Sequence, residues 1–400
     1  MALTTLESVS IDTDSLSLKA VFEINILNKM IQTLNSLKNN PMFCLSLASK
    51  ELFHSNFLEW LFNIDANKFI ALIDDIADTQ LAHKNPAGGY VLYREKNNFD
   101  ICITHKEKPA KGKEKEVYDI VLENKVKSIP YKKQLDEYVS KIKGLKQENV
   151  KFILLSLANN FPQKEEISEQ WEIVNYKLLK EKIQSHYGRT NKYINDYCDF
   201  IDYLHKFQES ALGNVDSHLF AQSNDYKPYR LHDMYIKMRC SNFVVELYER
   251  LKCIATPEGL EVYFLENGYE SIRGKKGIYL QSTINKGQGT INVFLYLDDA
   301  NNDYIYEFVI QANTYRHGIN SEQYNNDLNA LWTAVKELSF IKDFNCSNYG
   351  NLSQSNSKLE YNHYGQVYVY KYLKTDNTTF NSLLDVVCTD VTNFIKTQPQ

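Results

Sequence analysis

The sequence predicts an α/β fold for the first half of the chain and an α+β fold with an antiparallel sheet for the second half. Three observations support this prediction. The first half has the order of helices, three strands, a helix and a strand that is typical of an α/β sandwich. A polar stretch at 213–230 follows it, and strand-like runs predominate beyond that stretch. At 400 residues the chain is long enough for two domains, and we expect them at 1–212 and 228–400.

Apolar residues at helical spacing predict three helices before the first strand. The first helix has the longest stripe, which runs from Val21 to Leu34. The second has its apolar stripe at Phe53, Phe57, Trp60, Leu61 and Ile64. The predicted ranges of these helices are 17–39, 48–64 and 67–78.

The hydrophobic period then changes to that of strands rich in Val, Ile and Tyr. The polar segment KEKPAKGKEKE joins the second and third of these strands as a hairpin loop, and Pro130 suits the first turn of the next helix. The apolar run KFILLSL predicts a buried strand. The predicted strands are Tyr90–Glu95, Phe99–Thr104, Val117–Val126, 151–157 and Trp171–Val174, and the helices are 130–143, 176–186 and 192–211.

The second half begins with a predicted helix at 231–252. Arg316 and His317 follow a predicted strand and could touch a substrate, although a turn at a strand end exposes such residues in any case. The other predicted elements of this half are strands at 260–266, 277–284, 291–298, 304–312 and 366–373, and helices at 321–338 and 379–396.

The composition limits the classes of function. The net charge of −5 gives no overall attraction to nucleic acid, so any attraction must be local. One region, 106–133, has nine lysines against five carboxylates. Seven scattered cysteines lack zinc-site spacing and indicate reduced thiols. No signal peptide is evident and no apolar run approaches the ~20 residues of a membrane span, so we expect a cytoplasmic protein without a membrane partner.

The strand at 117–126 carries the most informative residues. Glu123 and Lys125 are two positions apart, so their side chains project from the same face. Ile120, Val121 and Leu122 indicate that the strand is buried. A buried carboxylate and a buried ammonium need partners or a metal ion.

Asp100 lies on the preceding strand of the predicted hairpin, and neighbouring strands are about 4.8 Å apart. Asp100 and Glu123 could therefore share a divalent cation such as Mg²⁺, with the Asn124 carbonyl as a further ligand. Such a cation acidifies water, and a lysine beside it stabilises negative charge. The residue types suit phosphodiester hydrolysis. Asp119 is an alternative to Asp100, because it has the same parity along the strand as Glu123.

The set Asp100…Glu123-Asn124-Lys125 resembles the D…(D/E)xK signature of the PD-(D/E)XK nuclease superfamily, although Phe99 stands where a proline often precedes the aspartate. Gln134 and Tyr138 resemble the QxxxY element of its RecB-like branch and share a helical face. HSNFLEWLF resembles a helix that precedes the core in one bacterial subgroup. The resemblance implies a restriction-endonuclease-like core with a mixed sheet and a nuclease that uses Mg²⁺ or Mn²⁺, with DNA as the expected substrate.

Three further residues are candidate metal ligands. The RecB-like branch often has an upstream histidine that binds metal, and His54 fits that place; it could instead pack at a helix surface. Glu51 lies one turn earlier and could equally serve the helix dipole. Glu95 ends a strand next to Asp100 and could be an exposed charge. Lys132 and Lys133 are expected to be solvated, with phosphate contact as the alternative.

Two other classes of function stay open. A fold of this type can lose catalysis and keep nucleic-acid or protein binding, and the chain could also be an assembly protein. The resemblance also suggests a role in bacterial defence.

We expect the C-terminal domain to select the target, so deletion of 228–400 should relax target preference. It could also mediate a homo-oligomer or a partner-protein contact.

Overall fold

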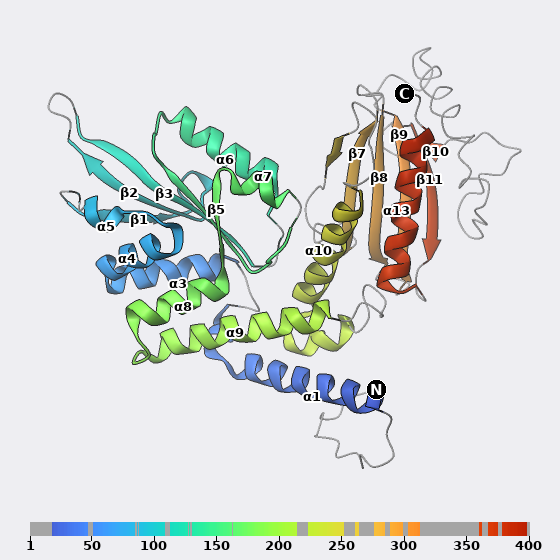
Figure 1. Ribbon diagram of the computed structural model, residues 1–400, viewed down its shortest axis with the longest axis horizontal. Helices are drawn as coiled ribbons and strands as arrows, with labels where there is room; N and C mark the ends of the chain where they lie inside the picture. Colours follow the sequence, from blue (N-terminus) through green and yellow to red (C-terminus); the bar gives the residue numbers. More distant parts are fainter. Residues whose placement is uncertain are drawn as a thin grey trace, which may run out of the picture.

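The computed structural model places two separate sheets in the chain (Figure 1). One has five strands and belongs to the first half of the chain, and the other has six strands and belongs to the second half. The structure describes residues 18–46, 51–84, 86, 88–108, 113–126, 128, 130–161, 163–213, 223–251, 261–263, 276–284, 289–298, 303–312, 360–361, 367–374 and 378–397.

The five-stranded sheet is mixed and follows chain order from β1 to β5. The first three strands are antiparallel, and the last three are parallel. Apolar side chains at Ile120–Leu122 and Ile153–Leu155 are almost fully buried, as the sequence predicts for central strands. The strands are β1 (Tyr90–Arg94), β2 (Ile101–Glu107), β3 (Lys115–Lys125), β4 (Lys151–Ser156) and β5 (Trp171–Asn175).

The β2–β3 hairpin extends further into the polar segment than the sequence pattern predicts. Lys106 pairs with Glu116 and Glu107 pairs with Lys115 across the two strands. Opposite charges in cross-strand pairs stabilise antiparallel pairing. The hairpin therefore continues where the apolar alternation has already stopped.

Helices cover both faces of this sheet, which confirms the predicted α/β arrangement (Figure 1). One face is covered by α6 (Lys132–Gly144) and α7 (Lys164–Ser168). The other face is covered by α3 (Glu51–Ile64), α4 (Ala66–Ala77), α5 (Leu81–Lys84) and α8 (Tyr176–Tyr187).

Three short helices were not predicted, and the predicted start of the helix at 130–143 was wrong. The missed helices are α2 (Pro41–Leu45), α5 and α7. α2 begins because the Asn40 side chain accepts hydrogen bonds from the Met42 and Phe43 N–H groups. Pro130 does not lie in the first turn of α6, because Tyr131 is the N-cap residue and the helix begins at Lys132.

The helices α1 (Leu18–Asn39) and α9 (Lys192–Leu212) pack against each other below the sheet, and α9 continues toward the second half of the chain (Figure 1). A 3₁₀ segment (Ser223–Tyr229) and α10 (His232–Leu251) follow. Tyr226 is buried against Phe207 of α9 and Tyr235 of α10. This part of the predicted boundary stretch is therefore packed rather than solvated.

The six-stranded sheet is antiparallel, with the order β10-β11-β9-β8-β7-β6. The helix α13 (Phe380–Thr397) packs on α10, and the Tyr306 hydroxyl donates to Asp390 of α13 at 2.7 Å. The strands are β6 (Glu261–Tyr263), β7 (Lys276–Ile284), β8 (Gly289–Asp298), β9 (Asp303–Ala312), β10 (Glu360–Tyr361) and β11 (Val367–Lys374).

Some predictions for the second half are not tested by these strands. The helix at 321–338 and the Arg316-His317 pair lie outside the described residues. The domain limits 1–212 and 228–400 and the α+β assignment of the second half therefore stay predictions. No helix in the described ranges has the length and apolar character needed to cross a membrane.

Candidate active site

The carboxyl end of β3 brings a buried acid and a buried amine together. The Lys125 Nζ atom lies 2.9 Å from Glu123 Oε1. The two residues are 8% and 4% exposed, respectively. Their side chains share a face because they are two positions apart on one strand. The pair therefore has the geometry that the strand period predicts.

Two residues of α6 extend this pair. Lys125 Nζ donates to Gln134 Oε1 at 3.0 Å, and Gln134 Nε2 donates to the Tyr138 hydroxyl at 3.0 Å. Gln134 and Tyr138 reach this position together because they are one turn apart on the helix. The Tyr138 ring also packs edge-on against Phe99. The Gln134 amide thus orients the Lys125 ammonium, and the Tyr138 hydroxyl orients the Gln134 amide.

Asp100 joins the cluster from a turn and not from the predicted strand. β2 begins one residue later, at Ile101, which pairs with Leu122. The Asp100 Oδ2 atom accepts a hydrogen bond from the Asn124 N–H at 2.7 Å. The N–H and C=O of one strand residue point to the same side, so the Asn124 carbonyl also faces Asp100 beyond the end of the ladder.

The turn before Asp100 positions Glu95 differently from the other candidates. Glu95, Asn97 and Asn98 all have positive φ angles, so the turn is tight. The Glu95 N–H donates to the Asp100 carbonyl at 3.3 Å, but its side chain is exposed. Among the described residues, no ion pair or hydrogen bond links the Glu95 carboxylate to the cluster.

Glu51 brings a third carboxylate to the end of β3. Its Oε1 atom accepts hydrogen bonds from the Val126 N–H at 3.0 Å and from the Ser128 hydroxyl at 2.8 Å. Glu51 is the first described residue of α3. It therefore joins the start of that helix to the chain that follows Lys125, a role that no sequence pattern indicates.

Burial and mutual repulsion shift the pKa values of the acids. Burial raises the pKa of Glu123 to about 7, Lys125 opposes this shift, and Asp100 and Glu51 add to it. Burial likewise raises the pKa of Asp100, against the Asn124 hydrogen bond and the Lys125 charge. Burial opposes the charge of Lys125, but Glu123, Glu51 and Asp100 outweigh it and raise the pKa of the ammonium. The Lys125 ammonium is thus surrounded by three carboxylates, those of Glu123, Glu51 and Asp100.

The arrangement of sheet, turn and helix agrees with the comparison with known families. Residues 40–199 match the PD-(D/E)XK nuclease superfamily. This part of the chain is similar to the PD-(D/E)XK nuclease superfamily. The match supports a nuclease that acts on nucleic acid, as the resemblance of the motif implied. No curated protein and no solved structure shows a significant match to the chain.

Members of the PD-(D/E)XK superfamily generally use divalent metals, and the donor set of this domain fits such an ion. The Glu123 Oε2 atom is buried and has no hydrogen-bond partner in the described part of the chain. Asp100 and Glu123 are hard oxygen donors close to one another. No group of three or more His, Cys, Asp or Glu residues in the described ranges is arranged to hold a metal. Mg²⁺ needs only one or two carboxylates, because it keeps several waters.

His54 lies in an aromatic cage next to the cluster. Its Nδ1 atom is 3.0 Å from the Tyr197 hydroxyl, and its ring stacks on Phe200. Burial lowers the pKa of His54 to about 3, so the ring is neutral. The Nε2 atom is buried with no hydrogen-bond partner among the described residues. A neutral imidazole nitrogen is a competent metal ligand, but the contacts given for His54 are those of a packed residue.

The Asn124 side chain is held on the face of the sheet opposite to Lys125. Its Nδ2 donates to Ser55 Oγ at 2.6 Å, and its Oδ1 accepts from the Tyr176 hydroxyl at 3.0 Å. These bonds leave only the backbone carbonyl of Asn124 as a potential ligand. Ser55 and Tyr176 were missed by the sequence analysis, because only the fold brings α3 and α8 to the same point of β3.

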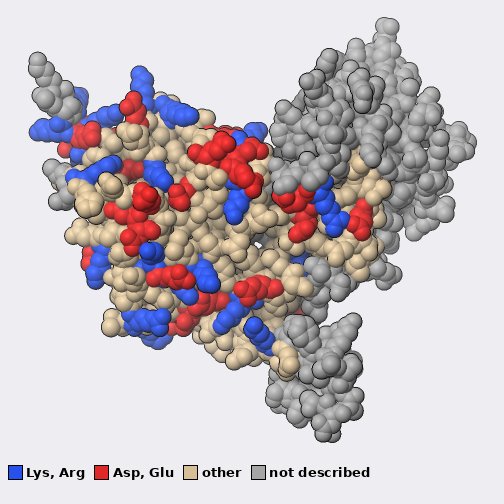
Figure 2. Space-filling view, viewed as in Figure 1, with Lys and Arg blue, Asp and Glu red and all other residues tan. Residues whose placement is uncertain are grey.

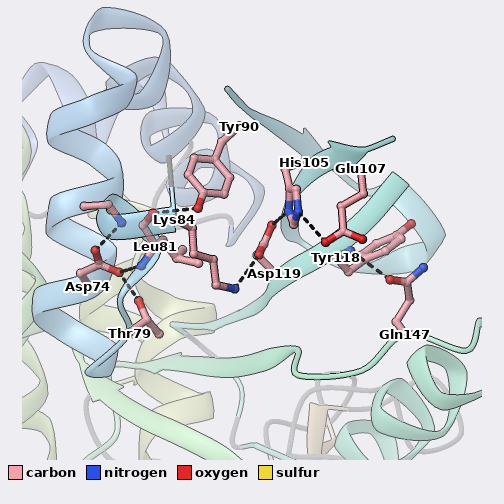
Figure 3. A network of polar contacts seen from close by, with 11 residues as sticks. Asp74, Thr79, Leu81, Lys84, Tyr90, His105, Glu107, Tyr118, Asp119 and Gln147 are labelled. Atoms are coloured by element: carbon pink, nitrogen blue, oxygen red, sulfur yellow. Dashed lines mark hydrogen bonds and ion pairs between the residues drawn. The ribbon is translucent and has the colours of Figure 1, made fainter. Parts of the chain in front are cut away.

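The alternative acid, Asp119, lies in a different network (Figure 3). Its Oδ1 is 3.1 Å from Lys84 Nζ, and its Oδ2 is 2.5 Å from His105 Nδ1. Ile103 pairs with Ile120 but Thr104 pairs with Tyr118, so Asp119 is the extra residue of a β-bulge. The bulge breaks the alternation along β3, and Asp119 therefore contacts α5 rather than the face covered by α6.

Proposed function

We propose that the protein is a metal-dependent nuclease that hydrolyses phosphodiester bonds, with DNA as its substrate. The observation that carries this proposal is the Lys125 ammonium held between Glu123 and Gln134 beside the Asp100 carboxylate. A buried excess of acids is costly for a fold, and a divalent cation would offset it. The Glu123 Oε2 atom, which has no hydrogen-bond partner among the described residues, supplies a donor for such a cation.

Asp100, Glu123 and the Asn124 carbonyl would hold Mg²⁺ or Mn²⁺. When bound, the cation neutralises phosphate oxygens and acidifies the attacking water. Glu51 contributes negative charge to this region and fixes the backbone after Lys125 through Val126 and Ser128. Glu95 and His54 stay candidate ligands from the sequence, and no contact in the described residues joins either to Asp100 or Glu123.

Lys125 acts directly on the reaction in this proposal. Its ammonium orients the attacking water and stabilises the charge that develops on the phosphate. Gln134 is a positioning residue, because its amide holds the ammonium on the Glu123 side of the site. Tyr138 positions Gln134 in turn and supports its rotamer. Pre-organisation of this kind favours catalysis, because little reorganisation is needed when charge develops.

The substrate must be drawn to the site locally. In Figure 2, lysines and arginines are interspersed with acids, and no single basic patch dominates the described part of the visible face. A net charge of −5 agrees with this distribution. The metal and Lys125 would therefore supply much of the positive charge that meets the scissile phosphate.

The test is a cleavage assay with the full-length protein on supercoiled plasmid, linear duplex, single-stranded DNA and RNA. Mg²⁺, Mn²⁺ and Ca²⁺ are compared with a chelator. We expect cleavage with Mg²⁺ or Mn²⁺, and its loss in Glu123→Gln and Asp100→Asn. Lys84→Met serves as a matched control, because Lys84 pairs with Asp119 in the middle of β3 and not with the candidate site.

Absence of cleavage on every substrate with either metal would contradict the proposal. Unchanged DNA affinity in Asp100→Asn, measured by fluorescence anisotropy, would then favour a catalytically silent binding module. Absence of both cleavage and nucleic-acid binding would favour an assembly role, which size-exclusion chromatography with and without DNA would examine.

A further inference from the structure

A pocket of about 200 Å³ opens directly beyond the catalytic end of β3. It is smaller than the roughly 300–1,000 Å³ of sites for drug-sized ligands, so it suits one small ring system. Four chain segments line it: the residues after β3, the residues after β4, α9 and α10. Its lining includes Val126, Ser128, Asn160, Gln208, Ser241 and Asn242.

The pocket adjoins the candidate active site through the chain that follows β3. Val126 lines the pocket and follows Lys125 directly, with their Cα atoms about 3.8 Å apart. The Leu157 N–H donates to the Lys125 carbonyl at 2.9 Å, which holds the chain after β4 against the end of β3. A nucleotide whose phosphate lies at Lys125 would therefore have its base within reach of this pocket.

The lining combines apolar side chains with uncharged hydrogen-bonding groups. Val126, Met238 and Val245 supply apolar surface. Asn160, Gln208 and Asn242 supply amides, and none of the three has a hydrogen-bond partner among the described residues. The amides can donate and accept, and the apolar groups can cover a flat ring.

The charge of the lining excludes a phosphate as the ligand. The lining residues include no lysine or arginine, and Glu209 is their only charged residue. Phosphate binding needs cations or clustered N–H groups. A neutral aromatic ring with polar edges fits both the apolar side chains and the amides of the lining.

We propose that this pocket binds the nucleobase next to the scissile phosphate and gives the enzyme a base preference at that position. The inference rests on the proposed nuclease function, because it takes the scissile phosphate to lie at Lys125. Asn and Gln side chains read base edges through paired donors and acceptors. Gln208 and Asn242 reach the pocket from two helices and are its specificity residues.

The experiment sequences the product ends after partial digestion of random-sequence DNA, single-stranded and duplex, with Mn²⁺. We expect wild-type product ends to be enriched in one base beside the cut. Gln208→Ala and Asn242→Ala should reduce that enrichment about tenfold, with total cleavage changed much less. Gln80→Ala is the matched control, since Gln80 is an exposed glutamine between α4 and α5.

Unchanged base bias at the product ends in both pocket variants, with normal cleavage, would overturn the pocket proposal and leave the nuclease proposal intact.

If no DNA is cut, the nuclease proposal fails instead, and a binding experiment tests the pocket. That experiment compares fluorescein-labelled DNA with an abasic oligonucleotide of equal length by anisotropy. Weaker binding to abasic DNA in the wild type, and equal binding in Gln208→Ala, would support a base pocket. Equal wild-type affinity for both would reject it.

Discussion

The middle and the carboxyl end of β3 both bury charged side chains, but the partners of these side chains differ. In the middle of the strand, Asp119 has a partner for each carboxylate oxygen, Lys84 for one and His105 for the other (Figure 3). At the carboxyl end, Glu123 has a partner among the described residues for only one oxygen, and three acids face one amine. A fully paired network stabilises a fold, whereas an unbalanced one suggests a missing ligand.

The same comparison separates two explanations of a buried ion pair. A structural pair tolerates no loss of a partner, because the remaining charge is left buried. Loss of the Lys125 amine should cost a large factor in rate and less in stability, because the acids that remain can take up a proton or a cation. Substitutions at the Glu123–Lys125 pair and at the Asp119–Lys84 pair therefore test the assignment within a single protein.

The largest expected effect is on cleavage in Lys125→Met. This change keeps the shape of the stem and removes the ammonium that faces the phosphate, so cleavage should fall about 10²–10³-fold. Initial rates on the best DNA substrate measure it. Lys84→Met, which removes a partner of Asp119, should keep cleavage within a small factor. Equal loss in both variants would show that the Glu123–Lys125 pair and the Asp119–Lys84 pair do not differ in role.

Asp119→Ala should have the largest effect on stability. It leaves the buried His105 ring without its carboxylate partner, and we expect a loss of about 1–3 kcal/mol in the free energy of unfolding, the cost of a buried polar group that loses its hydrogen bond. Urea unfolding measures it. Glu123→Gln is the comparison, and without metal it should be close to neutral because it relieves repulsion among acids. A destabilisation as large as that of Asp119→Ala would place Glu123 in a structural network.

The affinity for metal should depend on pH through Glu123. Burial raises the pKa of Glu123 to about 7, so in the metal-free fold the carboxyl is protonated below pH 7. The folded pKa lies above the ordinary value, so this group stabilises the metal-free fold at low pH and loses that contribution as pH rises through 7.

A cation must displace this proton, so Mn²⁺ affinity should increase about tenfold per pH unit up to pH 7 and then level off. Isothermal titration calorimetry from pH 5.5 to pH 8 measures the slope. Glu123→Gln should lose the slope, and Asp119→Asn should keep it. A flat profile in the wild type would argue against Glu123 as the ligand that titrates.

The smallest expected effect concerns the helix that supports Lys125. Tyr138→Phe removes the hydroxyl that holds Gln134, and we expect a reduction of cleavage of only a few fold, about 1 kcal/mol for a neutral hydrogen bond. Gln134→Ala should reduce cleavage more, because it removes the direct partner of the ammonium. The rates of both variants and of the double variant measure this. Strictly additive losses would show that the two residues do not act through one chain of contacts.

Much of the core was predictable because its signals are local. The strands β1, β3, β4 and β5 and the helices α1, α4, α8 and α9 follow from hydrophobic period, with small shifts at their ends. The short helices were not predictable in this way. α2 depends on one cap at Asn40, and α5 is tied by Asp74, which accepts from the N–H groups of Leu81 and Ala82.

The candidate site was predictable to a different extent for each residue. Glu123 with Lys125 and Gln134 with Tyr138 share faces fixed by the strand and helix periods. Glu51 and Asn124 were named as ligands, but the bonds that hold them come from segments far apart in the sequence.

The sequence by itself determined the family motif, the order of elements and the two pairs of residues that share a face, because a strand and a helix each repeat over a few residues. The tertiary structure decided which acid joins them. Asp100 reaches Asn124 because β2 starts one residue later, and Asp119 turns toward Lys84 because a bulge interrupts β3. Register and bulges result from the packing of distant segments, and no local period encodes them.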